Sequence, residues 1–105
     1  MLMRALPIIL ALSAVNVAQA QDGRPQAGRA LAEANCARCH AIGATGSSAL
    51  AGAPAFRDLR RRYPVEQLAE ALAEGIVTGH PAMPEFRMEA RQIADFLAYL
   101  NTLGR

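Results

Sequence analysis

The residues best placed to do chemistry in this chain are two cysteines and a histidine that fall within five positions. Cys36, Cys39 and His40 form the pattern Cys-x-x-Cys-His, and the chain has no other cysteine. Two thiols at positions i and i+3 lie on one side of a helical turn, from which they can reach two vinyl groups on adjacent pyrroles. The next residue then points its imidazole at the iron between them. The pattern therefore predicts covalent haem attachment of the c type.

Two other uses of these side chains remain as alternatives. A disulfide between Cys36 and Cys39 would suit an exported protein, but a thioredoxin-like redox site requires a strand-helix-strand context that the sequence lacks. A structural zinc site requires four ligands, and beyond these three residues the chain offers only His80 and carboxylates. Haem attachment is thus the favoured interpretation.

The first twenty residues have the order of a secretory signal peptide. Arg4 precedes an apolar run that extends from Ala5 to Val17, and Ala18-Gln19-Ala20 follows it. This order predicts cleavage after Ala20. A membrane anchor would need an apolar run of about 20 residues, and this run is shorter. We therefore expect residues 1–20 to be removed, and residues 21–105 to form one domain in the periplasm without stable membrane insertion.

Composition limits what residues 21–105 can do alone. The hydrophobic content of the chain is 52%, but much of it is alanine, so the core must be small. Domains of this size usually need a disulfide, a metal or a cofactor for stability. Eleven arginines and nine acidic residues leave a net charge of +2, which would fall to +1 on loss of Arg4. This is not the basic excess of a nucleic-acid-binding protein, so we expect no nucleic acid partner.

Three stretches carry helical periodicity, and none carries sustained two-residue alternation. They cover residues 25–35, 64–74 and 89–103. In the first stretch, Pro25 suits the first helical turn. Ala27, Leu31 and Ala34 share one face there, and the stretch leads directly to Cys36.

The remaining segments are predicted to be loops with one short helix. Residues 41–55, rich in Gly, Ala and Ser, form a long loop, and such a loop in a small domain is usually functional or wrapped on a ligand. A short helix is predicted over residues 57–62. Gly75 lies where the second helix should be capped, and residues 75–86 contain two prolines and should be irregular. The predicted fold class is all-α, with three main helices and long loops around one covalently bound haem.

At this point the sequence resembles the class I cytochrome c family, the small monohaem electron carriers of bacteria and mitochondria. The resemblance covers essentially all of residues 21–105. Beyond the haem stretch it rests on the segments GRALAEANC, APAFRDL and GHPAMPEF and on the closing segment IADFLAYLNTL. It implies a helical cytochrome c fold in which the N- and C-terminal helices cross and the haem is held in a cleft.

The resemblance also implies roles for individual residues. Cys36 and Cys39 would carry the thioether bonds to haem c. His40 would be the proximal ligand of the iron, and Met83 would be the distal ligand. Pro54 would accept a hydrogen bond from the other ring nitrogen of the proximal histidine, a contact that fixes the ring and raises its basicity.

Other positions follow the family or depart from it. Gly28 occupies the small-residue position where the terminal helices cross closely. Ala32 stands at a position that is often aromatic, so the helix contact there should be thinner or be filled by Phe96 or Tyr99. The chain has no tryptophan, so contacts with the haem propionates would fall to Tyr63 or to a set of arginines that we otherwise expect to form a solvated charged face: Arg57, Arg60, Arg61 and Arg62.

The distal ligand decides the function. Met83 lies between Pro81 and Pro84 in a stiff loop suited to hold a thioether over a haem face. His80 lies three residues upstream and would give a bis-histidine site, although a surface role is also open to it. Met88 lies near the start of the last helix, where methionine is most often core filler. Methionine ligation favours ferrous iron and predicts a positive midpoint potential.

A six-coordinate iron does not readily bind substrate, so the sequence predicts an electron carrier and not an enzyme. Its partners would be a donor dehydrogenase or membrane complex and an acceptor oxidase or reductase, met by a monomer in transient complexes of small interface. One alternative is a cytochrome subunit bound tightly to a periplasmic dehydrogenase through an apolar patch at Ile42, Ile76 and Val77. A third hypothesis is a haem sensor or peroxidase-like protein in which Met83 is labile.

Overall fold

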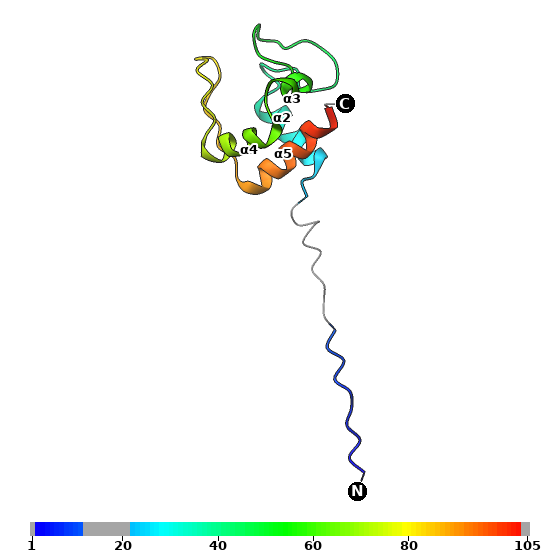
Figure 1. The fold of residues 1–105 in the computed structure, drawn as a ribbon. Coiled ribbons are helices and arrows are strands. Elements are labelled where there is room, and N and C mark those ends of the chain that lie inside the picture. Colours follow the sequence, from blue (N-terminus) through cyan, green and yellow to red (C-terminus); the bar gives the residue numbers. More distant parts are fainter. Residues whose placement is uncertain (1, 12–21, 104–105) are drawn as a thin grey trace.

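The computed structural model describes residues 2–11 and 22–103, and the helices within them confirm the predicted all-α class (Figure 1). The elements in chain order are α2 (Pro25–Asn35), the 3-10 helix η1 (Phe56–Asp58), α3 (Leu59–Arg62), α4 (Val65–Glu74) and α5 (Ala90–Leu103). The described residues contain no β-strand, and the one pairing of that kind is an isolated antiparallel bridge between Ile76 and Phe86.

The described part of the N-terminal segment, residues 2–11, forms no helix or strand, and its side chains are exposed. The predicted cleavage point after Ala20 lies outside the described residues. None of the helices described above is both long and apolar enough to cross a bilayer.

Prolines and one glycine set the helix boundaries that the sequence predicts. Pro25 is the first residue of α2, because its ring holds φ at a helical value and its missing N–H has no partner to lose there. Tyr63 precedes Pro64 and is extended, with φ −139° and ψ 139°. The helix α4 ends at Gly75, whose φ of 106° is easy for glycine and strained for other residues.

The terminal helices α2 and α5 cross backbone to backbone. Gly28 is buried at the crossing, and a Cβ placed on it would overlap the carbonyl oxygen of Asp95 and lie 2.8 Å from the Cβ of Tyr99. A Cβ on Gly23 would likewise overlap the carbonyl group of Ala94. Because Gly23 and Gly28 have no side chain, the backbone of residues 23–28 can lie directly on α5.

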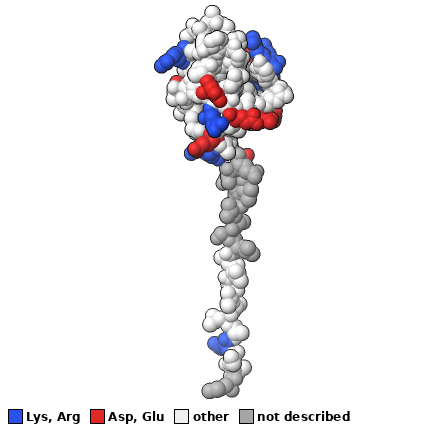
Figure 2. Space-filling model, turned by 90° about the vertical axis from the view of Figure 1, so that its left-hand side faces the viewer, with Lys and Arg blue, Asp and Glu red and all other residues white. Residues whose placement is uncertain are grey.

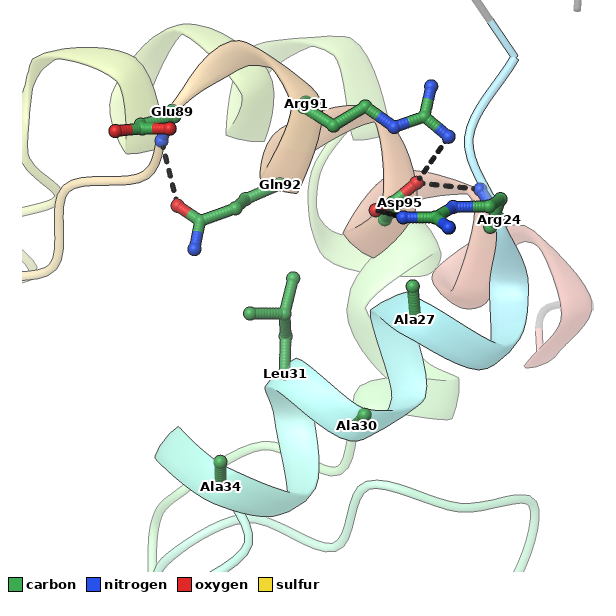
Figure 3. Close-up of a pocket in the computed structure, with 9 residues that line it drawn as sticks. All are labelled: Arg24, Ala27, Ala30, Leu31, Ala34, Glu89, Arg91, Gln92 and Asp95. Carbon is green, nitrogen blue, oxygen red and sulfur yellow. Dashed lines mark hydrogen bonds and ion pairs between the residues drawn. The ribbon is translucent and has the colours of Figure 1, made fainter.

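Ala27, Leu31 and Ala34 share one face of α2, as predicted, but this face is not the one that α2 buries. The structure buries Gly28 and Ala32 in α2, whereas Ala27 and Leu31 are half-buried and Ala34 is exposed. Those three line an open groove of about 470 Å³ beside α5 (Figure 3). A hydrophobic pattern draws attention to large apolar side chains such as Leu31. Two helices that cross closely must instead have small residues at the contact, and in α2 these are Gly28 and Ala32.

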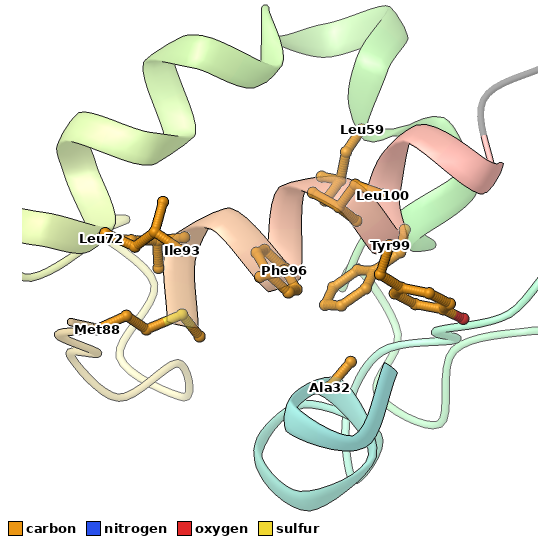
Figure 4. Close-up of a cluster of buried hydrophobic side chains, with 9 residues drawn as sticks. Ala32, Leu59, Leu72, Met88, Ile93, Phe96, Tyr99 and Leu100 are labelled. Atoms are coloured by element: carbon orange, nitrogen blue, oxygen red, sulfur yellow. The ribbon is translucent and has the colours of Figure 1, made fainter. Parts of the chain in front are cut away.

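The core lies between α5 and side chains from α2, η1, α3 and α4 (Figure 4). Ala32 is completely buried there, and its methyl group points toward the aromatic rings carried by α5. Phe96 and Tyr99 belong to the same buried cluster as Ala32. Met88 is 8% exposed and packs in the same cluster, as expected for core filler. The buried cluster comprises Ala32, Phe56, Leu59, Leu72, Met88, Ile93, Phe96, Tyr99 and Leu100.

Asp95 belongs to α5, and its carboxylate is buried against the start of α2. The sequence pattern does not predict this contact. Its carboxylate accepts a hydrogen bond from the Arg24 backbone N–H at 2.8 Å and pairs with the guanidinium of Arg91 at 3.1 Å (Figure 3). Because Arg24 is the residue just before α2, Asp95 caps that helix from another element. The backbone hydrogen bond, helped by both guanidinium groups, lowers the pKa of Asp95, although burial acts in the opposite direction.

We expect Gly28→Ala to destabilise the protein. Alanine improves helix propensity by about 1 kcal/mol, but its methyl group would overlap the Asp95 carbonyl and force α2 away from α5. Overpacking of this kind typically costs about 1–3 kcal/mol. Chemical denaturation would measure the loss. Gly43→Ala is the matched control, because nothing lies within 4 Å of a Cβ there, and equal unfolding midpoints for the two variants would contradict a close crossing.

We expect Asp95→Asn to remove part of the acid sensitivity of folding. The native pKa of Asp95 lies below its ordinary value, so its ionised form stabilises the fold above about pH 4 and this contribution disappears as the pH falls through the native pKa. Urea denaturation should find the variant less stable than wild type at pH 7, with the gap closing in acid. Glu33→Gln, which breaks the exposed Arg29 pair, should show little effect at either pH. A gap that stays constant with pH would refute the role of the charge.

Candidate functional site

The two cysteines and His40 belong to a single turn at the end of α2. The N–H of Cys36 donates to the Ala32 carbonyl at 2.8 Å, so this residue closes the helix. The N–H groups of Cys39 and His40 then donate to the Cys36 carbonyl at 3.1 and 2.9 Å. Both thiols are free and half-buried. Burial raises the pKa of the Cys36 thiol, which keeps it protonated.

The imidazole of His40 is oriented by a backbone carbonyl. Its Nδ1 lies 2.7 Å from the carbonyl oxygen of Pro54, the residue that the resemblance singles out for this contact. Since a carbonyl oxygen only accepts hydrogen bonds, Nδ1 carries the proton in this arrangement. The lone pair is therefore on Nε2, the nitrogen that a metal would need.

The long loop that brings Pro54 to His40 is tied at several points. Ser48 Oγ accepts a hydrogen bond from the Ala41 N–H at 2.9 Å. The Leu50 N–H donates to the Cys39 carbonyl at 3.1 Å, and the Phe56 N–H donates to the Ala41 carbonyl at 2.9 Å. The loop thus folds back onto the turn that carries the cysteines, as the prediction of a functional loop over residues 41–55 requires.

Aromatic contacts connect the imidazole to the core. The ring centroids of His40 and Phe56 lie 5.1 Å apart, with a tilted angle of 41° between the planes. Phe56 in turn meets Phe96 of α5 edge to face at 5.6 Å. In addition, the Tyr99 hydroxyl donates to the Ile42 carbonyl at 2.6 Å, two residues beyond the imidazole. The position of His40 is therefore set by α5 as well as by its own loop.

The Tyr99 hydrogen bond is one that sequence reasoning missed. The sequence predicts for Tyr99 only a role in filling space near Ala32, because a tyrosine on the apolar face of a helix gives no indication of what its hydroxyl reaches. The signal in the sequence is weak: a buried tyrosine usually finds an acceptor, but the acceptor here lies 57 positions away in the chain.

Met83 lies on a different loop, between α4 and α5. At the base of this loop the Ile76 N–H donates to the Phe86 carbonyl at 2.7 Å, and near its tip the Met83 N–H donates to the His80 carbonyl at 3.0 Å. Figure 1 shows the loop projecting away from the helices. Met83 is half-buried and lines a pocket of about 270 Å³. The structure therefore brings together Cys36, Cys39, His40 and Pro54, and places Met83 on a separate segment.

The donor set and its surroundings fit a covalently bound haem. Two free thiols and an imidazole with an available Nε2 share one turn, which is the chemistry that thioether attachment and iron ligation need. Several apolar side chains around the core are only partly buried, so they leave apolar surface for a flat hydrophobic group. They are Ile42, Leu68, Ala69, Ile76, Phe86 and Leu97.

The geometry of the described residues does not support a zinc site or a disulfide. Over residues 2–11 and 22–103, no group of three or more His, Cys, Asp and Glu side chains is arranged to hold a metal ion. The thiols of Cys36 and Cys39 are not joined to each other.

The arginines considered for the propionates differ in their surroundings. Arg60, Arg61 and Arg62 are exposed, in line with a solvated charged face. Arg57 is half-buried, and its Nη1 atom is buried without a hydrogen-bond partner among the residues described. A buried cationic donor of this kind is suited to a carboxylate, which leaves Arg57 as the candidate of this set.

Comparison with known proteins identifies the family of this chain. Residues 23–100 match the family model described as cytochrome C oxidase, cbb3-type, subunit III. A "Cytochrome c-553-like" protein of Synechocystis sp. (strain ATCC 27184 / PCC 6803 / Kazusa) is 33% identical over 84 residues, which is 80% of this chain and 73% of that protein. No solved structure gave a match. With its single Cys-x-x-Cys-His turn and its helical fold, the chain belongs to the cytochrome c family as a small monohaem class I c-type cytochrome that carries covalent haem c.

Proposed function

We propose that this cytochrome is a one-electron carrier of the periplasm in which His40 and Met83 are the two axial ligands of the haem iron. Membership of the family accounts for electron transfer by a haem c protein. The observation that carries the assignment of His40 as a ligand is the 2.7 Å contact between His40 Nδ1 and the Pro54 carbonyl. It holds the ring in one tautomer, leaves Nε2 for the iron and makes the imidazole a stronger donor.

Composition and burial narrow the choice of the distal ligand to the loop between α4 and α5. The chain has no lysine, and its arginines remain protonated and cannot ligate a metal. Met88 is committed to the core, where it is 8% exposed. Met83 is half-buried on a loop stiffened by Pro81 and Pro84. This thioether is therefore the soft ligand that we assign to the iron, with a positive midpoint potential as the consequence.

This ligation suits a carrier better than an enzyme. When bound, the haem supplies reversible one-electron chemistry, and the residues of the chain hold it and tune its potential. Two protein ligands leave no open position for a substrate. A sensor or peroxidase-like function would require Met83 to leave.

The proposed cleavage after Ala20 would spare the contacts that tie residues 22 and 23 to α5. Asp22 is the first residue of the domain described, and its carbonyl accepts a hydrogen bond from Arg91 Nη1 at 3.2 Å. Gly23 then packs against the Ala94 carbonyl. A cut after Ala20 would leave these anchoring contacts intact, and all the helices described, from α2 to α5, lie within residues 21–105.

The surface is consistent with transient docking of redox partners. Acidic and basic side chains are interspersed on the face shown in Figure 2, which disfavours strong long-range steering. Of the apolar patch expected at Ile42, Ile76 and Val77, only Val77 is largely exposed, at 77%, because the two isoleucines pack against the core. A permanently bound subunit is the second candidate function, and the family description, which names an oxidase subunit, favours it.

Mass spectrometry of the exported protein tests the cofactor and the processing together. The expected mass is that of residues 21–105 plus one intact haem, because each thioether forms by addition of S–H across a vinyl group and no atom is lost. The double variant Cys36→Ser/Cys39→Ser should release its haem into acidified organic solvent, whereas wild type should retain it. A colourless wild-type protein with the bare chain mass would overturn the assignment.

Two methionine variants test the distal ligand. Met83→Ala should abolish the far-red charge-transfer band of methionine-ligated ferric haem and lower the midpoint potential. Met88→Ala is the matched control: it should keep both properties while losing about 2–5 kcal/mol of stability, since Met88 fills the core. Absorption spectra and redox titrations would measure these effects. If Met88→Ala lost the band and Met83→Ala kept it, the assignment would be wrong.

A further inference from the structure

The guanidinium of Arg57 is the one buried polar group whose partner the polypeptide does not supply. Its Nη1 atom is the only buried side-chain nitrogen or oxygen without a hydrogen-bond partner in residues 2–11 and 22–103. Arg57 also takes part in no ion pair with those residues. Because a buried charged donor without an acceptor is strongly destabilising, we expect an acceptor from outside the polypeptide at this position.

Burial distinguishes Arg57 from the other arginines of residues 22–103. Arg57 is half-buried, whereas the other eight are all exposed to solvent. Water can satisfy an exposed guanidinium, so those residues need no further partner. They are Arg24, Arg29, Arg38, Arg60, Arg61, Arg62, Arg87 and Arg91.

Arg57 belongs to the segment that positions the imidazole of His40. Three residues before it, the Pro54 carbonyl oxygen lies 2.7 Å from His40 Nδ1. The Phe56 N–H donates to the Ala41 carbonyl at 2.9 Å, and the centroid of the Phe56 ring lies 5.1 Å from that of the imidazole. The unpaired guanidinium is therefore carried by the same short stretch of backbone that packs against the haem-attachment turn.

The cofactor of this family brings the missing kind of acceptor. Haem c carries two propionate carboxylates, and a guanidinium binds a carboxylate through strong charge-assisted hydrogen bonds. The chain has no lysine and no tryptophan that could hold a propionate instead, and Tyr63 is 51% exposed. We propose that Arg57 binds a haem propionate through its unpaired Nη1 and neutralises the charge of that carboxylate. The proposal requires the covalent haem but does not depend on which residue is the distal ligand.

This pairing would help to set the midpoint potential of the iron. A buried propionate without a cation would place an uncompensated negative charge near the iron, which favours the ferric state. Arg57 offsets that charge and, by favouring the ionised carboxylate, keeps it from taking up a proton near neutral pH. The potential is therefore higher than it would be without the cation, and it changes little with pH.

Redox titrations of three holoproteins over about pH 5 to 8 test the proposal: wild type, Arg57→Leu and Arg60→Leu. At the upper end of this range Arg57→Leu should have a lower midpoint potential than wild type. Its potential should also fall more steeply as the pH rises, because the unpaired propionate now titrates in the range. Arg60→Leu removes a charge of the same sign from an exposed position three residues away, so its potential should follow wild type.

A fourth variant, Arg57→Lys, separates charge from packing. Since it keeps the cation, its potential and pH profile should lie closer to wild type than those of Arg57→Leu. Both histidines are present in all four proteins, so their contribution to the pH profile cancels. The far-red band of the wild-type protein should persist in every variant, which would verify that the axial ligands are unchanged.

Three results would overturn the role of Arg57. One is an Arg57→Leu protein that loses stability in urea but keeps the wild-type potential and pH profile, because the side chain would then only fill space. Another is an equal shift of potential in Arg57→Leu and Arg60→Leu, which would reflect surface charge in general. The third is an equal shift in Arg57→Leu and Arg57→Lys, which would show that the cation has no effect.

Discussion

The close crossing of α2 and α5 at Gly28 is the contact on which the rest of the structure depends. The helix α2 ends at Cys36, so the place where α2 lies on α5 decides where the turn with the cysteines and His40 lies. Asp95 sets the register of this crossing, since its carboxylate is buried and bonded to the Arg24 N–H. Tyr99, one helical turn further along α5, then reaches the Ile42 carbonyl just beyond the turn.

The two segments that carry His40 and Met83 are held in different ways. The proximal loop is tied to the haem turn by hydrogen bonds of Ser48 and Leu50, and its imidazole is packed on Phe56. The distal loop is tied mainly at its base, where Ile76 pairs with Phe86. The segment after His40 is therefore tied along its length to the turn that carries the cysteines, whereas the loop with Met83 is tied to the rest of the fold at its base.

The small core explains why such a chain needs its cofactor. Nine residues form the buried cluster, and a domain of this size buries too little apolar surface to be comfortably stable. Partly buried side chains such as Leu68 and Phe86 surround that cluster. Covalent haem would complete the core, so the attachment turn contributes to stability as well as to electron transfer.

Local chemistry allowed much of this protein to be predicted from its sequence. Pro25, Pro64 and Gly75 act on their own backbone dihedrals, so the helix boundaries follow from neighbours in the chain. The Cys-x-x-Cys-His spacing likewise predicts its own turn and the group that it binds. The resemblance also predicted Gly28 and Ala32 as the positions of α2 that meet the last helix. Tertiary structure alone decided that Asp95 caps α2 and that Tyr99 holds the loop after His40. Each of these depends on how closely two backbones approach across the fold, and residue type along one segment does not encode that distance.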